Sequence, residues 1–197
     1  MGRIWIARHG ETAWNAVGRI QGHTDVELND TGRAQARALA GAVADAGLVA
    51  IWSSDLARAR ETAEIVAAEL GLAAPGTDVE LRERRYGAFD GLTRDECAAR
   101  YPDAWRGWTT GATHPPDGES RVAATERIQR AIARVHASAG GPLLVVSHGG
   151  VMRLWLAAQL DAAIPPIGNG AVYAVDYAVD RGGDGIVSAP LRARDSE

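Results

Sequence analysis

The alternation of short apolar runs with helical patterns most constrains the fold of this chain. Residues 3–7, 49–53 and 143–147 are apolar runs, and polar or glycine residues follow each run before a helical pattern begins. Consecutive apolar residues over such a short length are typical of strands that are buried on both faces of a parallel sheet. We therefore predict an α/β fold, a three-layer α/β/α sandwich with a mostly parallel central sheet.

Helix caps follow the early part of this pattern. Asn29 begins a helix that we expect to end at Gly47, and Ser54 with Asp55 begins a second helix that ends at Gly71. Glycine is a common stop signal because it adopts the left-handed conformation without strain. A helix between successive strands is the connection that a parallel sheet requires.

The middle of the chain has a different composition. Thr93 and Glu96 have the spacing of a capping box, which predicts a short helix after Thr93. Residues 101–118 then gather proline, glycine and the tryptophans Trp105 and Trp108. We predict a lid-like excursion over 101–118, without regular structure, whose indoles shape a pocket wall.

Three further features complete the predicted domain, which spans residues 1–197. Residues 119–139 form a long helical pattern with Val122 on its apolar side. The pattern of residues 171–179 predicts a strand. We expect this strand to lie at the exposed edge of the sheet near 172–179, where it could form the contact of a homodimer. Residues 192–197 are expected to form a disordered tail.

The composition excludes several classes of function. The net charge is −4, so no overall positive field exists to attract nucleic acid or an anionic membrane. All 21 basic residues are arginine, which excludes a Schiff-base lysine and a P-loop lysine. The single cysteine, Cys97, excludes an internal disulfide and fits a reducing compartment. The start shows no secretory signal and no apolar run approaches the roughly 20 residues that span a bilayer, so we expect a cytoplasmic protein.

Polar side chains follow the predicted strands at the points where they end. Arg8 and His9 follow the first strand, Arg58 lies in the helical turn after the second, and His148 follows the strand at 143–147. The carboxyl ends of parallel strands meet at one edge, where ligands collect in such folds. Arginine forks match phosphate oxygens, and a neutral imidazole such as that of His9 can attack phosphorus. We therefore predict a phosphate ligand, and no metal ion or other cofactor, because clustered cations repel metals.

Four motifs extend over nearly the whole chain, from residue 4 to about residue 178. They are Arg8-His9-Gly10-Glu11-Thr12 with Trp14-Asn15; Ser54-Asp55-Leu56 with Arg58-Ala59 and Glu61-Thr62; residues 81–87 (LRERRYG); and Ser147-His148-Gly149. Their order resembles that of the histidine phosphatase superfamily, the family of cofactor-dependent phosphoglycerate mutases and related phosphatases. The resemblance implies a phosphoglycerate mutase-like sandwich.

The resemblance also implies roles for the site residues. His9 becomes phosphohistidine, while Arg8, Arg58 and His148 hold the phosphoryl group. Further residues align with phosphate or substrate contacts of relatives: Asn15, Gln21, Gly22, Tyr86 and Gly149.

Glu83 falls on the acid of the family. It protonates the departing alkoxide and then deprotonates the attacking water, which requires a carboxyl that stays protonated near neutral pH through burial or a hydrogen-bonding acceptor. Nearby cations would oppose this, so we expect Arg82, Arg84 and Arg85 to point outward.

The favoured function is a metal-independent phosphoric monoester hydrolase that acts on a small phosphorylated metabolite. A 2,3-bisphosphoglycerate-dependent phosphoglycerate mutase is the first alternative, but it needs additional cations, and the segment 92–120 holds only Arg94, Arg100 and Arg106. A non-catalytic member that binds a phospholigand or a protein is the second alternative. A protein phosphatase would need a shallow pocket, which the predicted lid disfavours.

Overall fold

The computed structural model describes residues 2–179, 185–187 and 192–194. Within these residues the strands are β1 (Gly2–Arg8), β2 (Ala50–Ser53), β3 (Gly76–Thr77), β4 (Leu143–Ser147), β5 (Val172–Val179), β6 (Gly185–Val187) and β7 (Arg192–Arg194). They form one sheet in the order β3-β2-β4-β1-β5-β6, and β7 also pairs with β5. The sheet is parallel from β3 to β1 and antiparallel beyond β1.

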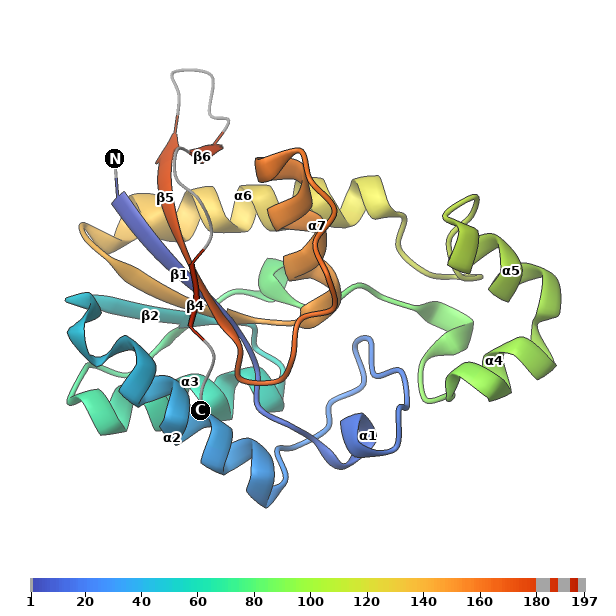
Figure 1. The fold of residues 1–197 in the computed structure, drawn as a ribbon, viewed down its shortest axis with the longest axis horizontal. Coiled ribbons are helices and arrows are strands. Elements are labelled where there is room, and N and C mark those ends of the chain that lie inside the picture. Colours follow the sequence, from blue (N-terminus) through green and yellow to red (C-terminus); the bar gives the residue numbers. More distant parts are fainter. Residues whose placement is uncertain (1, 180–184, 188–191, 195–197) are drawn as a thin grey trace.

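Helices cover both faces of this sheet (Figure 1). These are α2 (Asp30–Val43) and α3 (Ala57–Leu70) on one face, and α6 (Arg121–Ala139) and α7 (Gly149–Leu160) on the other. The shorter elements are α1 (Ala13–Ala16), α4 (Arg94–Arg100), α5 (Pro102–Thr110) and the 3₁₀ turns η1 (Ala44–Ala46), η2 (Val79–Leu81) and η3 (Gly87–Phe89). The predicted three-layer sandwich is confirmed.

Side chains that alternate along β1 form two cores, one on each face of the sheet. Ile4 and Ile6 pack among side chains of α6 and α7, which include Trp155. Trp5 and Ala7 pack among side chains of α2 and α3. Full burial of one isoleucine stabilises the fold by roughly 1.5–3 kcal/mol, so β1 anchors both layers.

The helix caps follow the prediction at α2 and depart from it at α3. Asn29 caps α2 by accepting a hydrogen bond from Gly32 N at 2.8 Å. Helix α3 begins after Leu56, and Ala57 N donates instead to Asp25 Oδ1 at 2.7 Å. The predicted cap residue Asp55 does not cap α3, because its carboxylate pairs with Arg82.

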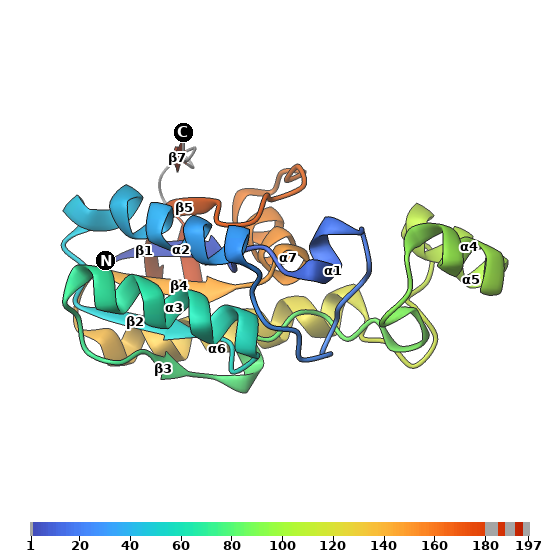
Figure 2. The same ribbon diagram turned by 90° about the horizontal axis from the view of Figure 1, so that it is seen from below.

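The segment 101–118 is a correction to the prediction, because half of it, residues 102–110, is helical. The capping box at Thr93 begins α4 as expected, and Pro102 then occupies the start of α5. Helix α5 buries none of its own residues, and its two indoles pack against Phe89 at ring distances of 5.7 and 5.6 Å. In Figure 2, α4 and α5 project away from the sheet, beyond α1.

The C-terminal expectations also change. Strand β5 lies between β1 on one side and β6 and β7 on the other, so it is not the exposed edge that a homodimer was expected to use. The expected tail at 192–197 begins with paired backbone in β7, and residues 195–197 lie outside the described residues. Val122 is 67% exposed because the buried stripe of α6 starts at Ala124, on the opposite side of the helix. None of the helices in the described part of the chain has the length and apolar composition needed to cross a membrane.

Candidate active site

The register of β1 and β4 brings two histidines together. Arg8 pairs with Ser147, so the next residues, His9 and His148, leave neighbouring strands at the same edge. Their ring centroids lie 5.1 Å apart. Both side chains are buried, and His148 occupies the position before the first turn of α7.

The contacts of His9 define its protonation. Its Nδ1 lies 2.6 Å from Gly10 O, a carbonyl that can only accept, so Nδ1 carries the hydrogen and Nε2 keeps a free lone pair. Burial, and then the charges of Arg58 and Arg8, hold the pKa of His9 well below its usual value. The imidazole is therefore neutral at neutral pH, which is the form that attacks an electrophile.

Two arginines, the buried Arg58 and the half-buried Arg8, supply positive charge to the same place. Arg8 donates to Ile167 O at 2.7 Å, and Arg58 donates to Gly22 O and Thr24 O at 2.8 Å each. Burial lowers the pKa of Arg58 to about 10, so this guanidinium stays protonated at neutral pH. Neither arginine forms an ion pair with a carboxylate among the described residues, and the Nε atom of each has no partner there.

The imidazole ring of His148 is buried in the sandwich. Neither ring nitrogen has a partner among the described residues, and the side chain is fully inaccessible. Burial, followed by the charge of Arg58, lowers its pKa well below the usual value. A neutral imidazole with one free N–H can donate to an anion that enters the site.

Glu83 lies on the loop between η2 and η3, with its carboxyl against the start of α7. Its oxygens accept hydrogen bonds from the backbone N–H groups of Gly150, Val151 and Arg84, each at 2.8 Å. The carboxyl is buried, as expected for the acid. Its partners among the described residues are donors, however, and not the hydrogen-bonding acceptor expected from the sequence.

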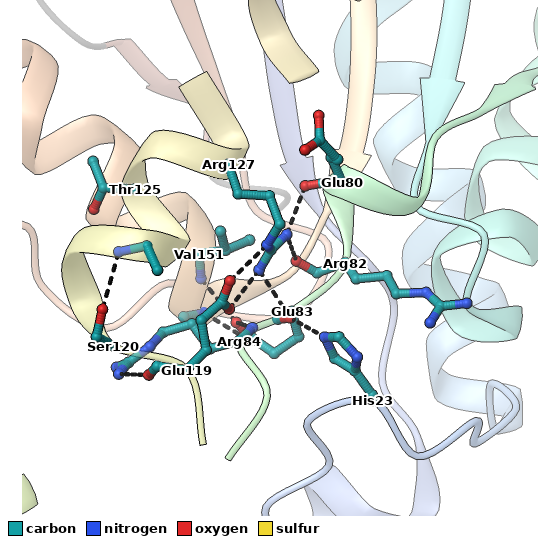
Figure 3. Close-up of polar contacts among 12 residues, drawn as sticks. His23, Glu80, Arg82, Glu83, Arg84, Glu119, Ser120, Thr125, Arg127 and Val151 are labelled. Carbon is teal, nitrogen blue, oxygen red and sulfur yellow. Dashed lines mark hydrogen bonds and ion pairs between the residues drawn. The ribbon is translucent and has the colours of Figure 1, made fainter. Parts of the chain in front are cut away.

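An arginine from α6 holds this loop in place, as Figure 3 shows. Arg127 donates to three backbone carbonyls, those of Glu80 at 2.6 Å, Arg82 at 2.9 Å and Glu83 at 3.3 Å. The same guanidinium pairs with Glu119 at 2.7 and 2.8 Å, and both side chains are mostly buried. The position of the Glu83 backbone therefore depends on a side chain 44 residues away.

The expectation that the arginines beside Glu83 point outward is partly wrong. Arg85 is exposed and Arg82 pairs with Asp55, but Arg84 is only 5% exposed. Its guanidinium donates to Glu119 O at 2.9 Å and lies 5.5 Å from the centre of the Tyr86 ring. The Arg84 side chain points inward because its guanidinium finds two neutral partners there, this carbonyl and this ring.

A cavity of about 180 Å³ opens among these groups and is called the first cavity below. It is lined by predicted site residues, namely Arg8, His9, Asn15, Gln21, Gly22, Arg58, Glu83 and Tyr86. Of the other two predicted residues, His148 packs against His9, and Gly149 lies beside the Arg8 side chain. Trp108 lines the cavity as expected, whereas Arg19 and Ile20 were not predicted.

Two positions that support His9 were also missed. Thr62 Oγ1 accepts from Gly10 N at 3.0 Å and donates to Arg58 O at 2.7 Å. Asn169 Nδ2 donates to His9 O at 3.1 Å and to Gly10 O at 3.2 Å. Thr62 stands inside a quoted motif, which was the signal that could have identified it.

The chain is similar to known proteins over most of its length. The family model of the histidine phosphatase superfamily (branch 1) matches residues 4–183. Phosphoglycerate mutase-like protein 4 of Arabidopsis thaliana is 42% identical over 155 residues, which are 76% of this chain and 67% of that protein. The metal-independent phosphoserine phosphatase of the same plant is 36% identical over 76% of this chain and 65% of that protein. The chain thus spans about two thirds of the length of these two relatives.

A solved structure shares the fold. The mycobacterial glucosyl-3-phosphoglycerate phosphatase in complex with VO3 has a TM-score of 0.84 and 31% sequence identity. The match covers 96% of this chain and 98% of that one.

Proposed function

Because the chain belongs to branch 1 of the histidine phosphatase superfamily and is a phosphoric monoester hydrolase, we propose that it cleaves small phosphorylated metabolites through a phosphohistidine at His9. The observation that carries this proposal is the contact between His9 Nδ1 and Gly10 O, at 2.6 Å. It leaves the Nε2 lone pair free in a cavity that Arg8 and Arg58 also line.

The first step transfers the phosphoryl group to the protein. The lone pair of His9 Nε2 attacks phosphorus, a P–N bond forms, and the P–O bond to the leaving group breaks. The departing alkoxide takes a proton from the carboxyl of Glu83, which lines the same cavity. Arg8 and Arg58 stabilise the charge on the phosphoryl oxygens, because both guanidinium groups are fixed in place before the reaction.

The second step returns the protein to its starting state. A water molecule gives its proton to Glu83 while its oxygen attacks phosphorus, and the P–N bond breaks to release inorganic phosphate. His148 donates one hydrogen bond to a phosphoryl oxygen in both steps, because its nitrogens are without partners among the described residues.

The proposal includes no metal ion. Two permanently charged arginines occupy the place where a divalent cation would meet the phosphate, and like charges repel. In the described part of the chain, no group of three or more histidine, cysteine or acidic side chains could hold a metal. One relative is itself named a metal-independent phosphoserine phosphatase, which supports the same chemistry.

Phosphate release from a panel of phosphomonoesters tests the proposal. The panel contains p-nitrophenyl phosphate, phosphoserine, glucosyl-3-phosphoglycerate, α-ribazole phosphate and 3-phosphoglycerate, with EDTA present. We expect release that survives chelation, disappears in His9→Ala and leaves an acid-labile phosphohistidine on the wild-type protein. Phosphate binding without any phosphohistidine would instead favour the non-catalytic member.

One observation favours a second candidate activity, that of a bisphosphoglycerate-dependent mutase. More arginines lie near the first cavity than the segment 92–120 supplies, because Arg84, Arg121 and Arg153 join Arg94 in lining a neighbouring cavity. Interconversion of 3-phosphoglycerate and 2-phosphoglycerate after addition of a 2,3-bisphosphoglycerate primer tests this activity. Conversion faster than phosphate release would identify the mutase as the main reaction.

A further inference from the structure

Residues 167–171, which lead into β5, hold the end of β1 in place. Gly170 N lies within hydrogen-bond distance of two carbonyl oxygens, those of Arg8 at 3.2 Å and His9 at 3.3 Å. Asn169 is the only residue of this segment with a polar side chain. It does not line the first cavity, so it acts on the site only through other residues.

The side-chain amide of Asn169 donates to three oxygens. Its Nδ2 atom lies 3.1 Å from His9 O, 3.2 Å from Gly10 O and 3.2 Å from Asn15 Oδ1. A backbone carbonyl can only accept, so the amino end of the amide must face these atoms. The two hydrogens of one amino group are therefore shared among three acceptors, two on the backbone beside the imidazole and one on a side chain.

The contact with Gly10 bears on the tautomer of His9. Gly10 O, to which Asn169 donates, also accepts the hydrogen on His9 Nδ1 at 2.6 Å. The other polar group of the same peptide unit, Glu11 N, donates to Gln35 Oε1 at 2.8 Å. Side chains thus hold both polar groups of this peptide, and its carbonyl faces Nδ1. If the carbonyl turned away, the hydrogen would be free to move to Nε2 and would block the lone pair that attacks phosphorus.

The contact with Asn15 fixes the direction of a second amide. Asn15 Oδ1 accepts hydrogen bonds from Thr12 N and Thr12 Oγ1 at 3.1 Å each, in addition to the one from Asn169. A backbone N–H can only donate, so the oxygen of the Asn15 amide must face Thr12. The amino end is then left to donate to an anion in the first cavity, which Asn15 lines. An amide turned the other way would present an oxygen to the phosphate and repel it.

We propose that Asn169 is a positioning residue for phosphoryl transfer, whose single amino group sets the His9 tautomer through Gly10 O and the direction of the Asn15 amide. Both effects present the required atom to the first cavity, a lone pair on His9 Nε2 and a donor on Asn15 Nδ2. This inference rests on the proposed function, because the tautomer matters only if His9 is the nucleophile. The tautomer itself is a property of the free protein and is measured without turnover.

Replacement of the amide tests this role. In Asn169→Ala we expect kcat/KM for phosphate release from p-nitrophenyl phosphate to fall about tenfold or more, because misplacement of a reacting group by about 1 Å costs up to about a hundredfold. Asn29→Ala is the matched control, since it also removes one asparagine amide. The side chain of Asn29 caps α2 and donates to Glu11 Oε1 at 2.9 Å, and it forms no hydrogen bond with His9 or Asn15. This variant should keep the wild-type kcat/KM.

A double-mutant cycle tests the contact between Asn169 and Asn15. Because Asn169 acts partly through the Asn15 amide, Asn169→Ala should cost less in an Asn15→Ala background than in the wild type. We expect the combined loss of kcat/KM to fall short of the product of the two single losses by about twofold or more, which is the lower limit for side chains in contact. Asn29→Ala should show no such coupling to Asn15→Ala. Losses of Asn169→Ala and Asn15→Ala that simply multiply would overturn the inference.

Nitrogen NMR of the protein with labelled histidine measures the tautomer directly. The His9 signals are those that His9→Gln lacks. In the wild type we expect the hydrogen on Nδ1 and none on Nε2, whereas Asn169→Ala should show a population with the hydrogen on Nε2. Should Asn169→Ala fail to fold, Asn169→Leu replaces it, because leucine keeps the shape of the asparagine side chain and carries no donor.

The outcomes separate this inference from the proposed function. Absence of phosphate release by the wild type would contradict the proposed function, and the catalytic role of Asn169 would fall with it. Release by the wild type, together with a His9 tautomer that Asn169→Ala leaves unchanged, would overturn only the positioning role. Equal losses of kcat/KM in Asn169→Ala and Asn29→Ala would assign the loss to stability and would also overturn it.

Discussion

The carboxyl edge of the sheet and the α4–α5 excursion face the same two cavities but are built in different ways. At the sheet edge, His9, Arg58 and His148 are almost completely buried, and each has its place set by an adjacent strand or helix of the sandwich. The excursion projects away from the sheet in Figure 2, and α5 buries none of its residues. The excursion is anchored through aromatic contacts and through the ion pair of Arg19 with Glu96.

This difference separates two tasks. Phosphoryl transfer depends on charges that are fixed before the substrate arrives, and the sheet edge supplies them in a buried, densely packed setting. Discrimination among leaving groups needs contacts that can vary without loss of the fold, and an exposed helix pair with few buried residues supplies these. Substitutions at the sheet edge should therefore abolish activity, and substitutions on the excursion should change substrate preference.

The largest effect is expected at the sheet edge, for His9→Ala. Without Nε2 no phosphohistidine forms, and phosphate release should fall by about a thousandfold or more. The measurement is release from p-nitrophenyl phosphate with EDTA present. His114→Gln is the control, because His114 is exposed and lines neither cavity, and it should keep wild-type activity. Residual turnover of His9→Ala within tenfold of the wild type would contradict the role of His9 as the nucleophile.

The next largest effect is expected for Arg127→Gln, a positioning residue behind the sheet edge. It removes a buried ion pair and three contacts to the Glu83 loop, so we expect kcat to fall about 10- to 100-fold with a smaller change in KM. The unfolding free energy should fall by about 3 kcal/mol, because Glu119 keeps a buried charge without its partner.

A matched variant and a pH profile separate positioning from stability. Arg130 lies on the same helix but pairs with Glu80 at the surface, so Arg130→Gln should leave kcat nearly unchanged. Displacement of Glu83 should also shift the pH–rate profile of Arg127→Gln. An unchanged profile together with an unchanged kcat would show that Arg127 serves stability alone.

On the excursion, Trp108→Ala should mainly affect binding. Trp108 lines both cavities, so its loss should raise KM for a small phosphomonoester about tenfold while kcat stays within about threefold, since no reacting group moves. Trp105→Ala is the matched control, because Trp105 packs in the same aromatic cluster but lines neither cavity. A fall in the kcat of Trp108→Ala as large as that of Arg127→Gln would contradict the proposal that the excursion affects substrate preference and the sheet edge affects catalysis.

The smallest effect is expected at the junction of the two regions, for Asp90→Asn. Burial raises the pKa of Asp90 to about 6 from 3.8, so the folded protein binds this proton more tightly than the unfolded chain does. The stability of the wild type therefore declines as the pH rises from about 4 to about 6, and the full cost persists above pH 6. Because the carboxyl is partly exposed, we expect Asp90→Asn to gain only about 1 kcal/mol at pH 7.5.

Denaturant unfolding at several pH values measures this difference. The gain should vanish below about pH 4, where both states of the wild type carry the proton. Asp45→Asn, at an exposed position, serves as the control and should show no such dependence. A gain that is the same at pH 4 and pH 7.5 would assign the effect to packing.

The convergence of Arg8, His9, Arg58 and His148 could be predicted because it follows from strand order alone. Their positions at the end of a strand, directly after a strand or one helical turn later place them at the shared carboxyl edge of any parallel sheet. The cap at Asn29 and the capping box at Thr93 were predictable for a similar reason, since each depends on residues within one turn.

Contacts that join distant segments could not be predicted. The sequence predicts that Asp55 caps a helix, but its carboxylate pairs instead with Arg82, which lies 27 residues later. The sequence predicts that Arg84 is a surface charge, but in the structure its guanidinium contacts the carbonyl of Glu119 and the ring of Tyr86 in the interior. The predictions of an exposed edge strand and of a disordered tail were wrong because the pairing between β5 and β7 leaves no local signal in the sequence of either segment.

The sequence by itself determined the layers, the edge at which the phosphate chemistry gathers and the residue types that perform it, because periodicity and caps act over a few residues. Only the tertiary structure decided which arginines neutralise a carboxylate and which remain free. A guanidinium has the same charge everywhere in the sequence, but its partners depend on chain segments that meet only when the sheet and its helices pack. Arg84, Arg94, Arg121 and Arg153 line one cavity and come from four such segments.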